Sequence, residues 1–197
     1  MALRRLRRRR AVFLDKDGTL VEDVPYNVDP DRILLTPRAG AGLAMLHEAG
    51  FRLVVITNQS GVARGMFGRE ALGQVEGELR RLLAREGVRL AGFYYCPHHP
   101  RGSDRRFAVA CSCRKPEPGL LRQAAAELGI DLPASWMIGD ILDDVEAGRA
   151  AGCGTILLDN GNETEWQLSP QRMPDMLADD LHHAACMILR GTRLEAG

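Results

Sequence analysis

Hydrophobic residues along this chain form two alternating patterns: short continuous runs, and longer runs in which apolar residues recur every three or four positions. The short runs cover residues 11–14, 51–56, 91–95, 136–138 and 155–158, and such runs are typical of strands buried on both faces of a parallel sheet. The periodic runs predict amphipathic helices at residues 37–49, 69–86, 118–128, 144–151 and 179–189. The alternation predicts an α/β fold, with an open, mostly parallel, Rossmann-like sheet and helices on both faces.

Residues between these elements predict the helix ends and the loops. Thr36 is expected to cap the helix that begins at Pro37, and Gly50 is expected to end it. Residues 160–174 show no period and predict a loop. The segments 21–35 and 97–114 are long for loops in a compact domain, and such loops are usually functional or metal-bound. No large inserted cap domain is expected, so the site should be fairly open.

Composition and charge favour one globular domain with a distinct leader. The chain has 197 residues, 45% of them hydrophobic and 26% charged, and no apolar run approaches the roughly 18 residues that cross a bilayer. Six of the 26 basic residues fall in the first ten, so residues 11–197 carry 20 basic against 26 acidic side chains. We expect a basic, disordered leader at 1–10 and a single domain at 11–197. The alternative for the leader is an arm that contacts nucleic acid or an anionic membrane.

Lysine and cysteine usage add two observations. Only Lys16 and Lys115 are lysines among the 26 basic residues, and an ammonium group does different chemistry from a guanidinium. The five cysteines come without a secretory signal, which predicts a reducing, cytoplasmic location. Two of them, Cys153 and Cys186, are expected to be small core residues.

Three of the predicted strands end in polar residues: Leu14 is followed by Asp15, Ile56 by Thr57, and Ile138 by Gly139 and Asp140. Because ligands of open parallel sheets bind outside the carboxyl ends of the strands, these residues are expected to converge on one site. Asp15 and Asp17 would face the same way on an extended backbone, roughly 6.7 Å apart. With Asp140 they make an oxygen-rich site that suits Mg²⁺.

Donor groups for a phosphate follow the second of these strands. Residues 57–61 (Thr-Asn-Gln-Ser-Gly) supply hydroxyl, amide and backbone N–H donors, and Lys115 adds a full positive charge from a separate loop. Phosphoryl transfer requires mainly positioning and charge aimed at the phosphoryl oxygens. These residues therefore predict phosphate chemistry.

A cluster of cysteine and histidine falls in the loop 97–114. Cys96, His98, Cys111 and Cys113 offer the three thiolates and one imidazole of a structural zinc site, although their spacing is tighter than in a zinc finger. His99 could replace His98 as the imidazole ligand. Unrelated surface cysteines or a disulfide are the alternatives to a metal. A metal bound here would fix the loop that carries Arg114 and Lys115.

Four segments together resemble the motifs of the haloacid dehalogenase (HAD) superfamily of phosphatases. They are Asp15-Lys-Asp17-Gly-Thr19, Thr57-Asn58, Lys115, and Gly139-Asp140 with Asp144. The resemblance implies that Asp15 is the nucleophile that forms an aspartyl-phosphate and that Asp17 is the general acid and base. It also implies that Asp15, the backbone carbonyl of Asp17, and Asp140 bind Mg²⁺, with Asp144 as outer support.

A narrower resemblance rests on residues 57–65, 94–100 and 111–116, which are similar to those of bacterial D-glycero-D-manno-heptose 1,7-bisphosphate 7-phosphatases. It implies removal of the 7-phosphate during nucleotide-activated heptose synthesis for lipopolysaccharide, by an enzyme that is usually a cytoplasmic monomer. It places zinc on Cys96, His98, Cys111 and Cys113. It places substrate contacts on Asp23, Tyr26, Thr57, Asn58, Gln59, Ser60, Arg114 and Lys115.

One residue departs from this family pattern. The family commonly has lysine directly after the last metal-binding aspartate, and this chain has Ile141 there. A missing cation could weaken the grip on phosphate or change which sugar phosphate fits. Alternatives to the heptose substrate are histidinol phosphate, a nucleic-acid 3′-phosphate or another small phosphomonoester. A remote alternative is a zinc-bearing nucleic-acid-binding module that uses the arginine leader.

Overall fold

The computed structural model describes residues 9–194 and gives a six-stranded sheet in which every strand pair is parallel. The strands are β1 (Ala11–Leu14), β2 (Arg52–Asn58), β3 (Leu90–Cys96), β4 (Trp136–Gly139), β5 (Gly154–Leu158) and β6 (Met176–Ala178). They lie in the order β3-β2-β1-β4-β5-β6. The strands β2 and β3 are therefore added on one side of β1, and the chain then crosses to the other side to add β4, β5 and β6. Such a reversal marks the place where ligands bind in open α/β sheets.

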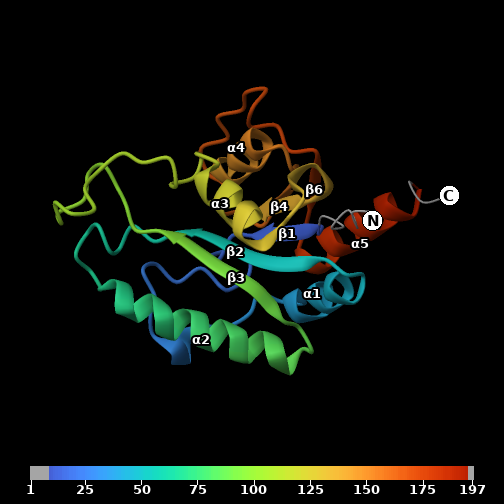
Figure 1. Cartoon of the computed structure of the whole chain (residues 1–197), viewed down its shortest axis with the longest axis horizontal. Coiled ribbons are helices and arrows are strands. Elements are labelled where there is room, and N and C mark those ends of the chain that lie inside the picture. Colours follow the sequence, from blue (N-terminus) through green and yellow to red (C-terminus); the bar gives the residue numbers. More distant parts are fainter. Residues whose placement is uncertain (1–8, 195–197) are drawn as a thin grey trace, which may run out of the picture.

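Helices cover both faces of this sheet (Figure 1). The helices α1 (Ala39–Glu48), α2 (Arg69–Arg85) and α5 (Leu181–Leu194) pack on one face, and α3 (Gly119–Leu128) and α4 (Leu142–Ala151) on the other. Val12 and Leu14 of β1 belong to the first core, whereas Ala11 and Phe13 belong to the second. Because successive strand residues face opposite sides, a strand covered on both faces is apolar throughout. The predicted fold is confirmed.

Several details of the prediction were wrong; α1 and α5, for example, each begin two residues after the predicted start. The strand β6 was missed, because only three residues pair there and their pattern is too short to show a period. The helix α4 begins at Leu142, two residues before the predicted start. The hydroxyl of Thr36 donates to the carbonyl oxygen of Thr19 (2.8 Å) and does not cap α1, whose N-cap residue is Arg38.

Only the last two residues of the predicted leader, Arg9 and Arg10, are among those described; residues 1–8 lie outside them. The backbone of Arg9 bonds with Gly129 and Asp131, and the carbonyl oxygen of Arg10 accepts from Arg52 N–H (2.9 Å). The Arg10 guanidinium lies 4.4 Å from the centre of the Phe51 ring. These two residues are therefore part of the domain.

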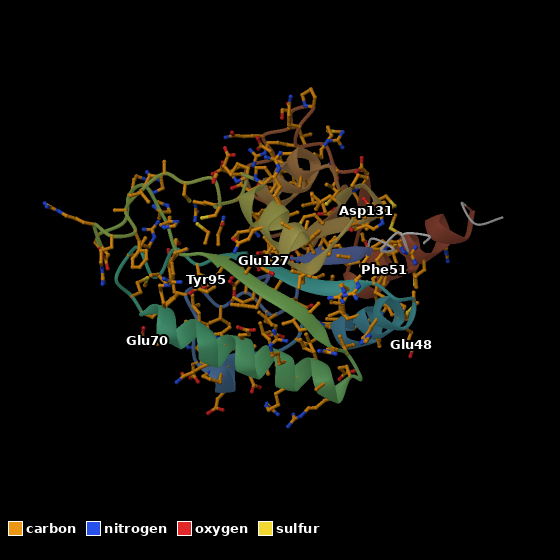
Figure 2. The ribbon with its side chains drawn as sticks, in the orientation of Figure 1. Glu48, Phe51, Glu70, Tyr95, Glu127 and Asp131 are labelled. Atoms are coloured by element: carbon orange, nitrogen blue, oxygen red, sulfur yellow. The ribbon has the colours of Figure 1, made fainter. Side chains whose placement is uncertain are left out.

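The functional loops leave from the carboxyl ends of the strands. Tyr95 marks that end of β3 and Glu70 marks the start of α2 (Figure 2). The segment 97–114 extends from β3 at this edge, and within residues 9–194 no separate domain is inserted in the sheet (Figure 1). No helix among the described residues is long and apolar enough to cross a membrane.

Candidate active site and metal centre

Asp15 stands at the carboxyl end of β1, where it faces the ammonium group of Lys115. Its backbone N–H continues the sheet by donating to the carbonyl oxygen of Ile138 (3.0 Å). Lys115 Nζ lies 2.5 Å from Asp15 Oδ1 and 2.6 Å from Asp144 Oδ1. It also donates to the carbonyl oxygen of Ile56 (3.0 Å). Burial lowers the pKa of Lys115, but the carboxylates of Asp144 and Asp15 outweigh burial and raise it, so Lys115 is a cation.

Asp15, Asp140 and Asp144 form a buried carboxylate cluster, in which one oxygen of each lies within 4.8 Å of the others. Burial, and then the charge of Asp15, raise the pKa of Asp140 to about 6. The single ammonium group of Lys115 lies against Asp15 and Asp144 but cannot balance three carboxylates, and unbalanced like charges in a buried place repel one another. Buried carboxylate oxygens are the ligand atoms that Mg²⁺ prefers, so these residues fit that ion.

The Asp17 carboxylate has different partners from those of Asp15. Its Oδ1 pairs with the ammonium group of Lys16, and its Oδ2 accepts from Gln59 Nε2 (3.1 Å). Burial raises the pKa of Asp17, Lys16 opposes this, and the charge of Asp15 adds to it. The extended spacing expected for Asp15 and Asp17 does not apply, because β1 ends at Leu14 and the chain then turns. The turn is closed where the Lys16 carbonyl oxygen accepts two backbone bonds, from Leu20 and Val21.

Lys115 is held in this site by residues at the end of β2. The Asn58 side chain donates to the carbonyl oxygen of Lys115 (3.1 Å) and accepts from its N–H (3.0 Å). The Thr57 hydroxyl oxygen accepts from Gln59 Nε2 (3.0 Å). The Asn58 side chain therefore positions Lys115, while its predicted contact with substrate stays a prediction.

A cavity of about 260 Å³ lies beside Asp17 and contains most of the expected substrate residues. Its lining consists of Asp17, Asp23, Pro25, Tyr26, Asn58, Gln59, Ser60 and Gly61. The Tyr26 side chain is 44% exposed and its backbone has a positive φ of 56°. Arg114 lies outside this lining, with its Nη1 donating to the carbonyl oxygen of His98 (3.4 Å).

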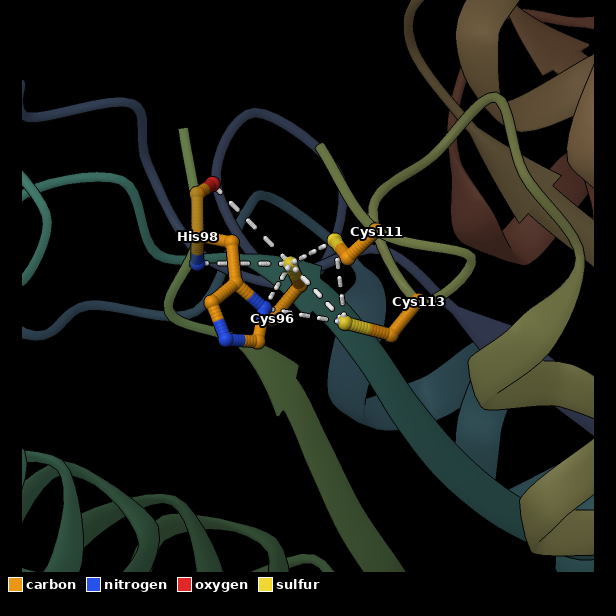
Figure 3. A group of neighbouring side chains, drawn as sticks. All are labelled: Cys96, His98, Cys111 and Cys113. Atoms are coloured by element: carbon orange, nitrogen blue, oxygen red, sulfur yellow. Dashed lines mark hydrogen bonds between the residues drawn. The ribbon is translucent and has the colours of Figure 1, made fainter. Parts of the chain in front are cut away.

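Cys96, His98, Cys111 and Cys113 converge at the base of the 97–114 loop (Figure 3). Their sulfur atoms lie 3.2 to 3.5 Å apart, and His98 Nδ1 lies 3.3 and 3.6 Å from two of them. These separations are far above a disulfide bond of about 2.05 Å, and the cysteines are free. They approach the roughly 3.8 Å edge of a tetrahedral zinc–thiolate site. Burial raises the pKa of Cys96, so a cation is needed to hold three thiolates here.

The other cysteines and His99 lie apart from this cluster. His99 Nδ1 accepts from the N–H of Arg101 (3.1 Å), and its Nε2 lies 3.4 Å from Arg64 Nη2. Cys153 is buried in the core between the sheet, α3 and α4, as predicted. Cys186 is only partly buried, on α5, so its predicted place in the core was wrong.

The sequence reading assigned no role to the loop after β5, which reaches this site. Asn160 Nδ2 donates to the carbonyl oxygen of Gly18 (2.7 Å), and Asn162 Nδ2 donates to Asp140 Oδ2 (2.8 Å). Glu163 accepts from the N–H of Leu142 (2.7 Å). The only sequence signal was a polar run, Asp159-Asn160-Gly-Asn162-Glu163, that directly follows a buried strand.

Known proteins similar to this chain agree with one another in family. The sequence profile of the HAD-hydrolase-like family matches residues 112–184. The chain is 46% identical over 148 residues to a D-glycero-beta-D-manno-heptose-1,7-bisphosphate 7-phosphatase of Yersinia pestis, covering 75% of this chain and 79% of the relative. It is 39% identical over 189 residues to a D-glycero-D-manno-heptose-1,7-bisphosphate 7-phosphatase of Chlorobaculum tepidum, covering 92% and 95%.

A solved structure is also similar along nearly the whole chain. It is the D,D-heptose 1,7-bisphosphate phosphatase from B. bronchiseptica, crystallised with magnesium and phosphate. The two chains share 30% sequence identity, with a TM-score of 0.76 and coverage of 92% of this chain and 99% of that chain.

Proposed function

Because this chain belongs to the HAD-like family of D-glycero-D-manno-heptose-1,7-bisphosphate 7-phosphatases, we propose that it hydrolyses the 7-phosphate of that sugar bisphosphate through an aspartyl-phosphate on Asp15. The observation that carries the proposal is the arrangement around Asp15, which pairs with Lys115 beside Asp140 and Asp144. Such a group of charges suits phosphoryl transfer, where catalysis is mainly positioning and electrostatics.

Asp15 and Asp17 divide the chemistry between them. Asp15 Oδ, aligned by Lys115, attacks phosphorus, and the sugar C7 oxygen leaves. Asp17, whose pKa is raised by burial, holds the proton that this oxygen takes up. The same carboxylate, now ionised, then accepts a proton from the water that attacks the aspartyl-phosphate, which releases inorganic phosphate and restores Asp15. Gln59 orients Asp17 for both steps by its 3.1 Å bond.

Magnesium is the metal that we propose for the carboxylate cluster. Asp15 and Asp140 would hold it together with the backbone carbonyl of Asp17, while Asp144 holds Lys115. When bound, Mg²⁺ neutralises charge on the phosphoryl oxygens and aligns them for attack. The donor set contains oxygen atoms alone, as a magnesium site requires.

The second metal proposed is zinc, held by Cys96, His98, Cys111 and Cys113. Its role is structural, because four protein ligands leave no open position. It would fix the loop that ends in Arg114 and Lys115, and Arg114 would meet the second phosphate or the hydroxyl groups of the sugar. A cytoplasmic location and a monomeric state stay predictions.

The substrate is tested by a side-by-side assay. Purified enzyme with Mg²⁺ is given D-glycero-D-manno-heptose 1,7-bisphosphate (both anomers) and histidinol phosphate, and phosphate release is measured. We expect rapid release from a heptose bisphosphate, with ³¹P NMR showing that the C7 phosphate disappears first, and no release by Asp15→Asn. Faster hydrolysis of histidinol phosphate would reject the substrate assignment, and an active Asp15→Asn would reject the nucleophile.

A further inference from the structure

Both oxygens of the Asp140 carboxylate have protein partners on opposite sides. Oδ1 accepts from the Thr19 hydroxyl (3.0 Å), and Oδ2 accepts from Asn162 Nδ2 (2.8 Å). Thr19 is fully buried and Asp140 is only 4% exposed. Two donors on different oxygens fix the rotation of the carboxylate about its Cβ–Cγ bond. Each oxygen keeps a lone pair for another partner.

The partner of Oδ2 comes from an unexpected element, the loop after β5. Gly161 turns this loop with a φ of +89°, and Asn162 N–H donates to Asn160 Oδ1 (3.2 Å). The Asn160 side chain ties the loop to the carbonyl oxygen of Gly18 (2.7 Å), in the turn that follows Asp15 and Asp17. Asn162 is thus aimed at Asp140 by a bond to the catalytic turn itself.

Space around Gly18 shows how closely these parts meet. A Cβ atom on Gly18 would lie 2.1 Å from Asp140 Oδ2 and 2.4 Å from Asn162 Nδ2. Gly18 also has a φ of +77°, which residues with a Cβ rarely adopt. The glycine therefore allows the carboxylate and the amide to meet directly against the catalytic turn.

Resting on the proposed function, we propose that Asn162 is a positioning residue that holds Asp140 in the orientation that binds Mg²⁺. Partners of metal-binding carboxylates set the direction of the ligand lone pairs and typically change metal affinity by about 10- to 100-fold. The neighbouring Ile141 has no side-chain donor and so cannot share this task. The polar loop after β5 is by this argument part of the metal site.

Metal binding without substrate tests the inference. Mn²⁺ alone is titrated into wild type, Asn162→Ala and Asn162→Leu, and free Mn²⁺ is followed by electron paramagnetic resonance. Leucine keeps the branching at Cγ but has no donor. Gln167→Ala is the matched control, because Gln167 lies in the same loop, is exposed, and donates to Glu165 (3.3 Å), away from Asp140. We expect the Mn²⁺ dissociation constant to rise about tenfold or more in both Asn162 variants and to stay unchanged in the control.

Steady-state kinetics distinguish a role of Asn162 in positioning Asp140 from a role in maintaining the fold. With p-nitrophenyl phosphate, the Mg²⁺ concentration for half-maximal rate should rise in the Asn162 variants, while kcat at saturating Mg²⁺ stays within about twofold of wild type. A Mn²⁺ dissociation constant equal to that of the control would overturn the inference, and so would a loss of kcat that saturating Mg²⁺ does not restore. Because the Mn²⁺ titration contains no sugar phosphate, its result holds whichever phosphate ester the enzyme hydrolyses.

Discussion

The Asn58 side chain bonds the backbone of Lys115 on both sides, donating to its carbonyl oxygen (3.1 Å) and accepting from its N–H (3.0 Å). These residues are 57 positions apart in sequence. The pair connects the end of β2 to the loop that delivers the cation to Asp15, so the position of the Lys115 ammonium group depends on the Asn58 amide.

Loss of this pair should slow catalysis. Asn58→Ala leaves both backbone groups of Lys115 without these partners, and each unsatisfied buried group costs about 1–3 kcal/mol. We expect kcat to fall about tenfold or more while zinc content is unchanged, measured by steady-state kinetics and metal analysis. Gln123→Ala, on the outer surface of α3, should keep the wild-type rate. An Asn58→Ala enzyme as fast as this control would contradict the positioning role.

Breaking the Lys115–Asp144 pair should destabilise the fold, although burial raises the pKa of Asp144 to about 8 and so weakens the pair at neutral pH. Asp144 is fully buried and lies 2.6 Å from Lys115 Nζ. Asp144→Asn leaves a buried cation with Asp15 as its remaining carboxylate partner, and breaking a buried pair costs about 3–5 kcal/mol. Urea unfolding should show a loss near the lower value, because Asp15 remains.

The neighbouring residue of the same helix is the control for this change. Asp143 forms a half-buried pair with Arg172 (2.6 Å), which also contacts Glu146 (3.5 Å), and a partly exposed pair contributes only about 1 kcal/mol. Asp143→Asn should therefore unfold close to wild type. Equal losses of unfolding free energy in the two variants would mean that the Lys115–Asp144 pair stabilises the fold no more than the Arg172–Asp143 pair does.

Zinc removal should disable the enzyme through the 97–114 loop. We expect about one zinc per chain in wild type and in Cys186→Ser, whose cysteine lies on α5 far from the cluster in sequence. Cys113→Ser should lose the metal, because a tetrahedral site needs all four ligands, and the midpoint of thermal unfolding should fall. Elemental analysis and calorimetry measure both. Full activity in zinc-free protein would exclude the proposed role of this loop.

Magnesium affinity should depend on pH through Asp140. The pKa of this carboxyl is raised to about 6 in the metal-free protein, by burial and then by Asp15. Below that pH the group binds a proton, which Mg²⁺ must displace, so affinity should fall up to about tenfold per pH unit. Above about pH 7, where Asp140 is already ionised, the Mg²⁺ affinity should no longer change with the protonation of this group. Isothermal titration with MgCl₂ at pH about 5 and about 7.5 would show the difference, and equal affinities would refute it.

Restoring the family's lysine should change substrate binding. Ile141 directly follows Asp140 and precedes α4. In Ile141→Lys an ammonium group beside the metal site should lower the KM for a sugar bisphosphate by a few-fold, about 1 kcal/mol for a partly exposed charge pair. Ile141→Met, similar in length and uncharged, should not. An unchanged KM in the lysine variant would show that this position lies out of reach of the phosphate.

Much of this architecture followed from the sequence. Continuous apolar runs such as residues 11–14 could only be buried on both faces, and strands alternating with helices allowed few arrangements. Asp15, Thr57 and Asp140 were foreseeable as neighbours because parallel strands end at the same edge. The cysteines and His98 were recognisable because metal binding requires particular atoms at short spacings.

Tertiary structure decided the partners of these residues. A sequence pattern records which side chains are polar but not which distant backbone group each one meets. For this reason the bonds of Asn58 to Lys115 were not foreseen, and Asn160 and Asn162 received no role. Their hydrogen bonds to Gly18 and Asp140 join segments more than 20 residues apart, and they form because the β5 loop folds back over the catalytic turn. Local periodicity determines elements, whereas the contacts between loops depend on how the finished sheet brings its strand ends together.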